Sequence, residues 1–538
     1  MKLEQIQLPV TNLLHADYIA NKDKTHEFFE YHQQENDFAK RAQYLQTKTY
    51  QYEKLALTIE QYMAPFGISE QVQVNLELLR NGAYAVVGGQ QAGILTGPLY
   101  SVHKAITVLL LAKKQSEALG MPIVPIFWIA GEDHDIEEIN HTYTMAEGQL
   151  KKRAYSIRSR KKTMASETVF DKAEMERSIR QIFSDYGETQ YTKEILMTVL
   201  HAIRNTMTFT DLFTSLMNDL FKQHGLLMID AANESFRHLQ SDYFVKLIEN
   251  SEAIALKVYE KEQRLAKLGY PLPIQANENG VNLFFVQDGE RHLLEWEDGL
   301  AKNKAAQLKF TKEQLIEIAK EKPHCLSNNV VTRPLMQDMI LPVLAFVGGP
   351  GELAYWATLK PAFEQLQLQM PIFTPRMHLT IVTRQVAAIL NEQHLKVEDV
   401  FNGKSADQLK QFLASIEDQE ALYMIESLQQ LIASQYDKLS MHLQQQTLDV
   451  SKVIAKNEQL HIQQFDYLKR KISEQVKLKH DTKIKRYEKI HQELTPFNGL
   501  QERIFSPYKY INETGHSFID RLMETEMELN CLHKVVFV

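Results

Sequence analysis

The chain has 538 residues, of which 44% are hydrophobic and 24% are charged, so it can bury more than one core. Its formal net charge of -8 argues against nucleic-acid binding, because a protein that follows a phosphate backbone usually carries a basic face. The sequence shows neither a long apolar run nor a basic amino terminus followed by an apolar segment. We therefore expect a multi-domain cytoplasmic protein without nucleic-acid or membrane partners.

The two cysteines, Cys325 and Cys531, lie far apart and form no CxxC pair. This usage is typical of a reducing compartment and argues against a thiolate metal cage. No sequence feature predicts a lowered pKa for the Cys325 thiol, so we interpret this residue as a bystander and expect no structural metal.

Helical patterns dominate the first 80 residues, where residues 23–45 and 52–63 place apolar side chains three and four positions apart. From Ala83 the order changes to an apolar run, a glycine-rich turn, a helix of about fifteen residues and a second apolar run, PIFWIA. This order predicts a βαβ unit with parallel strands. With further strands predicted at 225–230 and 341–349, the fold class is α/β with a Rossmann-like parallel-sheet core.

Two regions interrupt this core and are predicted to be helical and β insertions. Residues 150–200 begin with the basic segment KKRAYSIRSRKKTMAS, and residues 236–325 pass from helix into GVNLFFVQDGERHLLEW. The second sequence predicts a β-hairpin with Asp-Gly at its turn. We therefore expect a core over residues 1–384 with insertions at about 150–200 and 236–325.

A long antiparallel α-helical coiled-coil hairpin is predicted for residues 385–498. Residues 420–494 lack glycine and proline and keep apolar spacing of three and four, and the short link TLDVS at 447–451 allows one helix to fold back on the other. The apolar seam favours a homodimer, through the coiled coil. The basic stretch 469–489 suits a polyphosphate but is more typical of a solvated face. Residues 499–538 are expected to return to the core.

The turn GGQQAGILTG is the first candidate site. A glycine-rich turn between a strand and a helix directs backbone N–H groups toward an anion, so Gly93 and Gly97 are candidates for binding phosphate or carboxylate. Gln90 and Gln91 favour a site because side-chain amides both donate and accept hydrogen bonds. The turn fits neither common nucleotide motif, and a packed strand-to-helix connection is the alternative.

The second strand ends in GEDHDIEEINH, which places Asp133, His134 and Asp135 at the same predicted sheet edge as the glutamine turn. Such a cluster suits proton transfer or a divalent ion. Helix capping by Asp133 or Asp135 is the alternative interpretation. A zinc site with His141 is disfavoured, because the spacing is unusual and no third strong ligand is evident.

Two later motifs are predicted to join this edge. SNNVVTRPLMQD offers the amides of Asn328 and Asn329 and the cation of Arg333, which suit a carboxylate or phosphate. GGPGELAYW repeats the glycine turn after an apolar strand, with Glu352 and Tyr355 following on a helix. An asparagine turn and a surface arginine are the alternative for the first motif.

The motifs GGQQAGILTGPLYSVHKA, PIFWIAGEDHDIEEINH, SNNVVTRPLMQD and GGPGELAYW, in this order and followed by a helical hairpin, closely resemble the bacillithiol-synthesis cysteine ligase family (BshC). The resemblance covers nearly the whole chain. It implies a Rossmann-like core, a coiled coil and an enzyme that adds L-cysteine to glucosaminyl-malate in the last step of bacillithiol synthesis. It also implies a design similar to class I aminoacyl-tRNA synthetases.

Joining a carboxylate to an amine requires activation, so we expect ATP, with ADP as a product-like ligand, and Mg²⁺ bridging its phosphates. Our hypothesis gives His134, with Asp133 or Asp135, the task of positioning or deprotonating the attacking amine. The glutamine turn would hold phosphate or carboxylate, and the asparagine pair with Arg333 would orient malate or cysteine. A non-catalytic substrate-binding or scaffold subunit and a nucleotidyltransferase for another small metabolite remain alternatives.

Overall fold

The computed structural model describes residues 1–8, 12–32, 34, 36–157, 162–446 and 448–538. Part of the predicted basic segment, residues 158–161, and Thr447 of the predicted link lie outside the described residues. The chain forms two compact units, residues 1–382 with 499–538 and residues 383–498. Within the described ranges, no helix is both long enough and apolar enough to cross a membrane.

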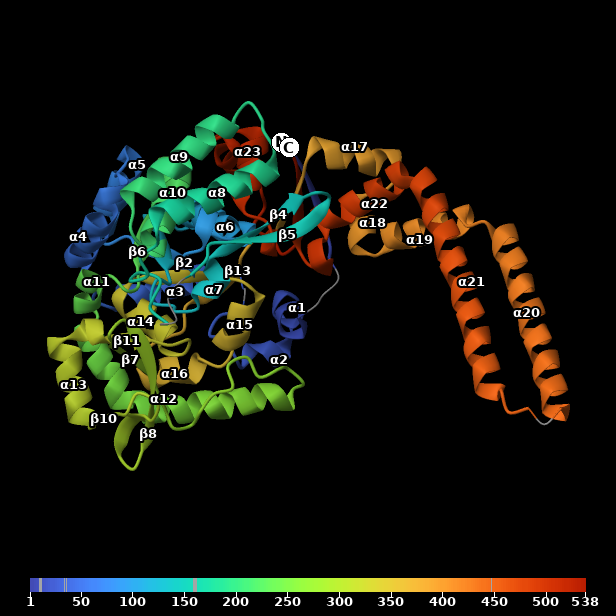
Figure 1. The fold of residues 1–538 in the computed structure, drawn as a ribbon. Helices are drawn as coiled ribbons and strands as arrows, with labels where there is room; N and C mark the ends of the chain where they lie inside the picture. The colour runs from blue at the N-terminus through green and yellow to red at the C-terminus, as the bar shows by residue number, and fades with distance from the viewer. Residues whose placement is uncertain (9–11, 33, 35, 158–161, 447) are drawn as a thin grey trace. The chain divides into compact units, whose positions relative to one another are not determined.

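A parallel sheet of five strands lies at the centre of the first unit, which confirms the Rossmann-like core (Figure 1). Its strands are β2 (Tyr84–Gln90), β3 (Ile123–Ile129), β6 (Leu227–Asp230), β12 (Val343–Gly348) and β13 (Ile372–Pro375). The order is β13-β12-β2-β3-β6, and each neighbouring pair is parallel. Every residue of β3 is buried, as expected for a strand that is covered on both faces.

The sheet has a topological switch point between β2 and β12. From β2 the chain proceeds to β3 and β6 on one side, whereas β12 and β13 lie on the other side. The loops that leave β2 and β12 therefore diverge at the carboxyl ends of these strands. In open α/β sheets, ligands bind in the crevice that such loops leave.

Helix α6 (Leu99–Leu119) connects β2 to β3 and has 21 residues, which corrects the predicted fifteen. It extends further because helix-forming residues continue to Gly120, which adopts the left-handed conformation that ends the helix. Thirteen of its side chains are buried, among them those of Lys104 and His103.

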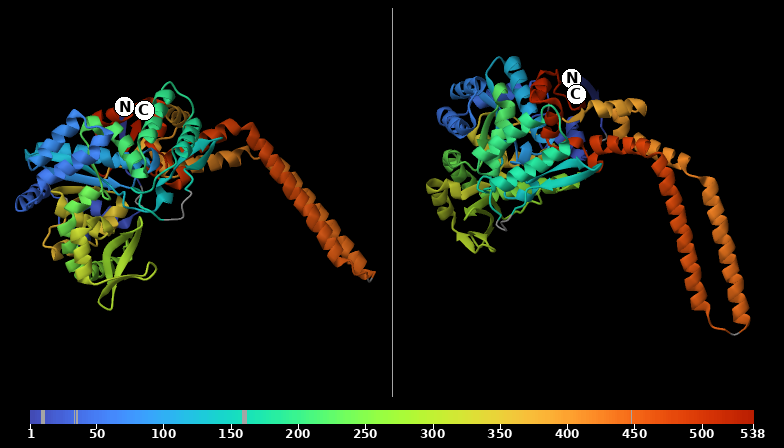
Figure 2. Two further views of the ribbon diagram at one scale, coloured as in Figure 1. Left: turned by 60° about the vertical axis from the view of Figure 1, so that its left-hand side comes forward. Right: turned by 45° about the horizontal axis from the view of Figure 1, so that its top comes forward.

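The predicted amino-terminal helices are present as α1 (Leu13–Ile19), α2 (Asp23–His26), α3 (Asp37–Gln46), α4 (Tyr52–Met63) and α5 (Glu70–Arg80). A strand, β1 (Lys2–Ile6), precedes them and pairs antiparallel with β15 (His533–Phe537). Strand β15 also pairs in parallel with β14 (Leu379–Val382). The two ends of the chain consequently lie side by side (Figures 1 and 2).

The predicted hairpin is confirmed in the second insertion, where Asp288 and Gly289 join β7 (Gly280–Gln287) to β8 (Glu290–Glu297) with positive φ angles. These strands belong to an antiparallel sheet that also contains β9 (Leu300–Asn303), β10 (Leu308–Phe310) and β11 (Leu326–Asn328). A separate hairpin consists of β4 (His141–Ala146) and β5 (Gln149–Ala154).

The remaining α-helices of the first unit are α7 (Ile136–Ile139), α8 (Lys172–Tyr186), α9 (Thr192–Asn205), α10 (Phe209–Phe221), α11 (Glu234–Leu239), α12 (Ser241–Lys267), α13 (Lys312–Glu321), α14 (Thr332–Ile340), α15 (Pro350–Trp356), α16 (Lys360–Gln365), α23 (Pro507–Thr514) and α24 (Phe518–Glu524).

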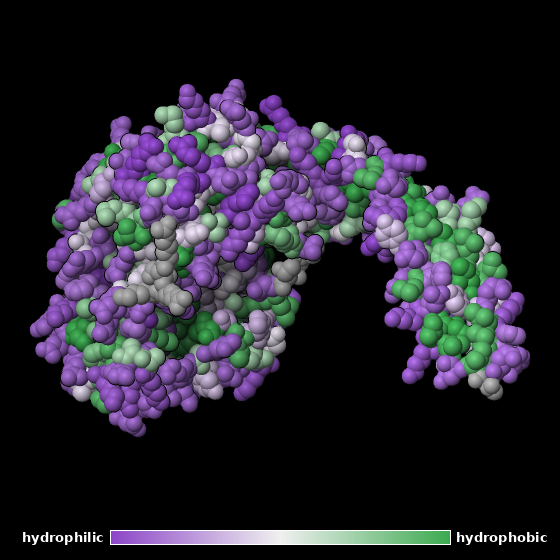
Figure 3. Space-filling model, in the orientation of Figure 1, coloured by the Kyte–Doolittle hydropathy of each residue, from purple (hydrophilic) through white to green (hydrophobic). Residues whose placement is uncertain are grey.

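The second unit is helical and contains α17 (Arg384–Glu392), α18 (Val397–Phe401), α19 (Lys404–Ile416), α20 (Gln419–Gln445), α21 (Ser451–Lys479) and α22 (Asp481–Leu494). Helices α20 and α21 lie side by side with opposite directions, which confirms the helical hairpin (Figure 2). Large apolar side chains remain exposed along both helices, including Met424, Leu431, Met441, Val453 and Leu460 (Figure 3).

Candidate active site

A pocket of about 290 Å³ opens at the carboxyl ends of the central strands, at the switch point between β2 and β12. It is the size of a small metabolite rather than of a macromolecule. Its walls come from the end of β2, from the loops after β2, β3, β12 and β13, from α6, α14 and α15, and from the segment that follows the helical unit. The lining residues are Gly89, Gln90, Gln91, Tyr100, Lys104, Ala130, Asp133, Arg333, Gly349, Pro350, Gly351, Glu352, Arg376 and Arg503.

Cations outnumber acids in this pocket. Among the described residues, four basic side chains and two carboxylates line it. Their close gathering in a concave site favours a ligand with several negative charges, since a low-dielectric wall strengthens each attraction. Three of the four cations are arginines, whose planar guanidinium groups suit carboxylate and phosphate oxygens.

Lys104 ties the end of β2 to the first turn of α15, the helix that follows β12. Its Nζ atom donates to the carbonyl oxygen of Gly89 at 2.6 Å, to Oε1 of Gln90 at 3.1 Å and to Oε2 of Glu352 at 2.6 Å. The Lys104 side chain is only 2% exposed. Burial lowers the pKa of Lys104, while the carboxylate of Glu352 opposes that change.

Glu352 has a second task at the start of α15. Its Oε2 atom accepts a hydrogen bond from the backbone N–H of Gly349 at 2.8 Å and so caps the helix. At the end of β2, a Cβ atom at Gly89 would collide with the carbonyl oxygen of Trp128 in β3, so only glycine fits there. These close approaches fix the base of the pocket.

Arg333 contributes a guanidinium group from the first turn of α14. Its Nη2 atom donates to the hydroxyl oxygen of Tyr355, and its charge lies 5.8 Å from the centre of that ring. Burial raises the pKa of Tyr355 to about 12, so the phenol stays protonated at neutral pH. Among the described residues, the buried Nε atom of Arg333 has no hydrogen-bond partner. An incoming anion would satisfy such a donor.

Arg376 enters the pocket from the loop after β13, and its charge lies 5.4 Å from the centre of the Tyr100 ring. Only 4% of the residue is exposed. Its backbone N–H donates to the carbonyl oxygen of Gly348 at 2.8 Å, which ties this loop to the end of β12. Arg503, from the 3₁₀ turn Gln501–Arg503, is exposed at the opening.

Asp133 is the acidic group that β3 delivers to the pocket. It is half-buried, and its Oδ1 atom lies 3.2 Å from Nη1 of Arg291 in the inserted sheet. Arg291 in turn donates to the carbonyl oxygen of Asn328 at 2.6 Å and stacks on Phe284 at 3.9 Å. The insertion therefore holds Asp133 in place while leaving it in the pocket lining.

The structure brings five predicted site residues into this one pocket, namely Gln90, Gln91, Asp133, Arg333 and Glu352. Tyr355 joins them indirectly through its contact with Arg333. The Nε2 atom of Gln91 donates to Oε2 of Glu138 at 3.2 Å, which orients this amide.

His134 and Asp135 do not line the pocket. The His134 ring packs edge-on against Phe284, 6.3 Å away, and its pKa is lowered by burial and then by Arg291. Asp135 is exposed at the start of α7, and its side chain makes no capping hydrogen bond there. Successive residues after a strand point in different directions. Of the predicted cluster Asp133, His134 and Asp135, only Asp133 therefore lines the pocket.

Arg333 lines the pocket, but neither Asn328 nor Asn329 does. Asn328 is buried at the end of β11, and among the described residues its Oδ1 atom has no hydrogen-bond partner. Asn329 accepts from the backbone N–H groups of Val331 at 2.8 Å and Thr332 at 3.1 Å. It therefore shapes the turn into α14, as the asparagine-turn alternative predicted.

Gly93 and Gly97 also lie outside the pocket lining. Their N–H groups donate to the carbonyl oxygens of Gln91 and Ile94, and the N–H of Leu99 donates to that of Phe505. A Cβ atom at Gly93 would lie 2.7 Å from the Cα atom of Gly97. These contacts support the packed-connection alternative for the second half of the turn.

Sequence reasoning did not identify Tyr100, Lys104, Arg376 or Arg503. Lys104 had a signal, because it is a cation within the mainly apolar first half of the predicted helix. Arg376 follows a short strand that was not predicted, and Arg503 comes from a segment distant in the sequence. Only the folded chain brings these side chains together.

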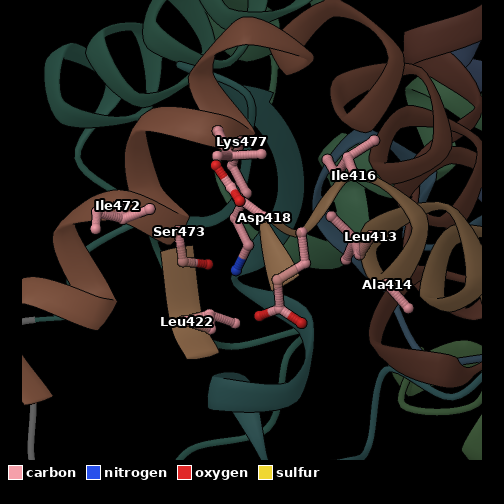
Figure 4. Close-up of a pocket in the computed structure, with 10 residues that line it drawn as sticks. Leu413, Ala414, Ile416, Asp418, Leu422, Ile472, Ser473 and Lys477 are labelled. Atoms are coloured by element: carbon pink, nitrogen blue, oxygen red, sulfur yellow. The ribbon is translucent and has the colours of Figure 1, made fainter. Parts of the chain in front are cut away.

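A second hollow, of about 230 Å³, lies in the helical unit between α19, α20 and α21 (Figure 4). Its walls include Leu413, Ile416, Leu422, Ile472 and Val476, together with the charged side chains of Glu417, Asp418 and Lys477. It lies away from the ends of the parallel strands, where ligands bind in open α/β sheets. Elsewhere in the described residues, Glu234, His238 and His324 form an exposed group with metal-ligand atoms within 4.8 Å of one another, and none of them lines the candidate active site.

Comparisons with known proteins cover the full length of the chain. Residues 1–377 match the family model "Bacillithiol biosynthesis BshC, N-terminal Rossmann-like domain", and residues 379–538 match "Bacillithiol biosynthesis BshC, C-terminal coiled-coil domain". A protein of Lysinibacillus sphaericus (strain C3-41) named "Putative cysteine ligase BshC" is 50% identical over 538 residues, with 100% of both chains covered. Proteins of the same name from Geobacillus kaustophilus (strain HTA426) and Geobacillus thermodenitrificans (strain NG80-2) are 38% and 35% identical, again with 100% of both chains covered.

Proposed function

The chain belongs to the BshC family of bacillithiol biosynthesis, and we propose that it is a cysteine ligase. In this proposal it joins the carboxyl group of L-cysteine to the amino group of glucosaminyl-malate, the last step of bacillithiol biosynthesis. The observation that carries the proposal is the switch-point pocket, in which four cations and two carboxylates surround a cavity of about 290 Å³.

The charges of the pocket complement those of the reactants. Glucosaminyl-malate carries the two carboxylates of its malate group, and a nucleotide carries a chain of phosphates. Arg333 and Arg376 offer planar donors for such oxygens, and Arg503 adds a cation at the opening. Lys104 adds positive charge at the base but uses its hydrogen bonds within the protein. These residues would bind and orient the anionic groups.

The carboxyl group of cysteine needs activation, since a carboxylate and an ammonium group do not condense usefully in water. ATP would supply it, as an aminoacyl-adenylate or as an acyl phosphate, and the basic lining suits the phosphates of either species. Magnesium binds through carboxylates and phosphate oxygens, and Asp133 is the pocket carboxylate that is not bonded to Lys104. Asp133 would therefore contribute a protein ligand if Mg²⁺ accompanies the nucleotide.

Where no metal ion occupies it, Asp133 is the group that would position the attacking amine. Its carboxylate is held by Arg291 and lines the cavity, so it can accept a hydrogen bond from an amine bound there and orient it. His134 and Asp135, which the sequence made its partners, lie outside the lining. We therefore assign the contact with the attacking amine to Asp133, and we give His134 a supporting position outside the pocket lining.

We further propose a homodimer formed by the helical unit. Exposed side chains such as Tyr423, Met424, Leu431, Met441 and Val453 give α20 and α21 an apolar surface that a second copy would cover (Figure 3).

The test is a product assay by mass spectrometry with purified protein, glucosaminyl-malate, L-cysteine, ATP and Mg²⁺, and with each component omitted in turn. The proposal expects bacillithiol only in mixtures that contain both substrates and the nucleotide. Formation of AMP and pyrophosphate would identify an adenylate, whereas ADP and phosphate would identify an acyl phosphate. No product, with tight binding of the sugar retained, would favour a substrate-binding subunit instead.

A further inference from the structure

Glu502 is a fully buried carboxylate directly behind the candidate active site, and it precedes Arg503 of the pocket lining. Four groups surround it. Arg376 Nη2 donates to Oε1 at 2.7 Å, and His378 Nδ1 donates to the same oxygen at 2.7 Å. His103 Nδ1 and the backbone N–H of Leu379 donate to Oε2 at 3.0 Å and 3.2 Å.

Two of these partners belong to the pocket lining or adjoin it in the chain. His103 immediately precedes Lys104 on α6, and Arg376 is itself part of the lining. Glu502 thus contacts the pocket cation Arg376 directly and precedes the cation Arg503 in the chain. It also accepts from His103, the residue before Lys104.

The segment that carries Glu502 is fixed to the core on both sides. Gln501 exchanges two hydrogen bonds of 2.8 Å with the backbone of Ile381 in β14. After Glu502, the carbonyl oxygen of Phe505 accepts from the N–H of Leu99, and Ser506 Oγ donates to the carbonyl oxygen of Leu95 at 2.9 Å. The carboxylate is therefore held rigidly against α6 and the loop after β13.

A guanidinium group as buried as that of Arg376 needs a fixed counter-charge, because desolvation is costly for an unpaired ion. Glu502 supplies this counter-charge. The Nη1 atom of Arg376 donates to the carbonyl oxygen of Met377 at 3.1 Å. Burial opposes the charge on Glu502, but Arg376 and then His378 hold the pKa of this carboxyl well below its usual value. Burial also lowers the pKa of His103, which favours a neutral ring that donates from Nδ1.

We propose that Glu502 is a positioning residue of the pocket, which holds Arg376 in the orientation that binds the anionic group of the substrate. This inference rests on the proposed role of the pocket in binding an anionic substrate. Glu502 touches neither substrate nor nucleotide in this account and acts through Arg376. The segment that follows the helical unit therefore contributes two residues to the site. Arg503 lines the pocket, and Glu502 holds Arg376 from behind it.

The experiment measures the dissociation constants of inorganic pyrophosphate and of malate for the full chain by isothermal titration calorimetry. Glu502→Gln keeps the size of the side chain and removes its charge, so both anions should bind about tenfold more weakly or worse. Glu502→Asp keeps the charge and should retain more affinity than Glu502→Gln. Equal weakening in both variants, or wild-type affinity in a folded Glu502→Gln protein, would overturn the proposal.

A double-mutant cycle separates positioning from a general structural role. If Glu502 acts through Arg376, adding Glu502→Gln to Arg376→Ala should change the dissociation constants by less than about twofold. A full additional loss in that background would contradict the inference. Glu262→Gln is the matched control, since Glu262 is 1% exposed and accepts backbone hydrogen bonds from Ile274, Gln275 and Ala276 outside the pocket lining. It should lower the melting temperature and leave anion binding unchanged.

These measurements are independent of catalysis. Anion binding that depends on Glu502 in a protein that forms no bacillithiol would refute the ligase proposal and support this inference. Product formation together with anion binding that is insensitive to Glu502 would support the ligase proposal and refute the positioning role of Glu502. Failure of the wild-type protein to bind either anion would overturn the positioning role, since there would be no bound anion to position.

Discussion

The Nζ atom of Lys104 lies 2.6 Å from Oε2 of Glu352, and this ion pair spans the switch point of the central sheet. Lys104 belongs to the helix that follows β2, and Glu352 belongs to the helix that follows β12. The two loops that diverge at the switch point are thus joined at the base of the pocket. Rigid support of this kind fixes the geometry of the groups above it.

Removing this tie should affect both stability and activity. Lys104→Met leaves the carboxylate of Glu352 without its cation, so we expect a loss of about 2 kcal/mol in the free energy of unfolding, since Glu352 is partly exposed. Ligation should fall by about a hundredfold, because the base of the pocket loses both its charge and its link between the loops. Urea denaturation and the product assay measure the two effects.

The double variant Lys104→Met with Glu352→Gln is the informative companion. It removes the unpaired carboxylate, so stability should return toward the wild-type value while activity stays low. If the double variant were no more stable than Lys104→Met alone, the ion pair would not be the source of the loss.

Arg333 should govern substrate affinity more than turnover. Arg333→Lys keeps a positive charge but loses the planar donor pattern and the contact with Tyr355, so the KM for glucosaminyl-malate should rise about tenfold. Tyr355→Phe removes only the hydroxyl group and should have a smaller effect in the same direction. Steady-state kinetics with each substrate varied in turn distinguish these outcomes from a change in kcat alone.

Asp230 should make stability depend on pH. Burial raises the pKa of this carboxyl to about 6 from its ordinary 3.8, although Ser166 donates to it at 2.5 Å. A raised pKa in the folded state means that the contribution of Asp230 to stability is full below about pH 4 and is lost as the pH rises through 6. The free energy of unfolding should therefore fall by about 3 kcal/mol between these two pH limits.

Asp230→Asn removes this titration. We expect the variant to gain stability relative to the wild type as the pH rises from 4 to 6, and to keep that gain above pH 6. Thermal unfolding across this pH range provides the measurement. A constant difference at every pH would show that Asp230 titrates normally.

The dimer proposal can be tested on the exposed face of α20. Light scattering should give the mass of two chains at micromolar concentration, and Leu431→Glu with Met424→Glu should give the mass of one, because buried apolar contacts are replaced by charge. Gln430→Glu adds a charge at an exposed polar position and should leave the mass unchanged. A wild-type protein that is monomeric under these conditions would refute the proposal.

Local patterns predicted the parts of the site that lie next to strands. The run Tyr84–Gln90, the helix after it and the second strand formed a recognisable βαβ unit, so Gln90 and Asp133 were placed at one sheet edge. The second glycine turn placed Glu352 there by the same logic. The direction in which a strand ends depends on neighbouring residues in the chain, so it can be predicted from the sequence.

Other features depend on contacts between distant segments. The neighbours of β2 in the sheet are set by long-range pairing, so the switch point itself was not visible in the sequence. Strand β1 was missed because its partner, β15, lies at the other end of the chain. The position of His134 outside the pocket depends on packing against Phe284 of the inserted sheet, and adjacency to Asp133 could not reveal it.

A matched pair of substitutions tests most directly whether ligation takes place in the switch-point pocket. Asp133 and Asp135 are two residues apart, but only Asp133 lines the pocket, and Asp135 is exposed. Initial rates of bacillithiol formation should fall at least about a hundredfold in Asp133→Asn and stay within about threefold of the wild type in Asp135→Asn. Full activity in Asp133→Asn, or the larger loss in Asp135→Asn, would place the chemistry elsewhere and contradict the account.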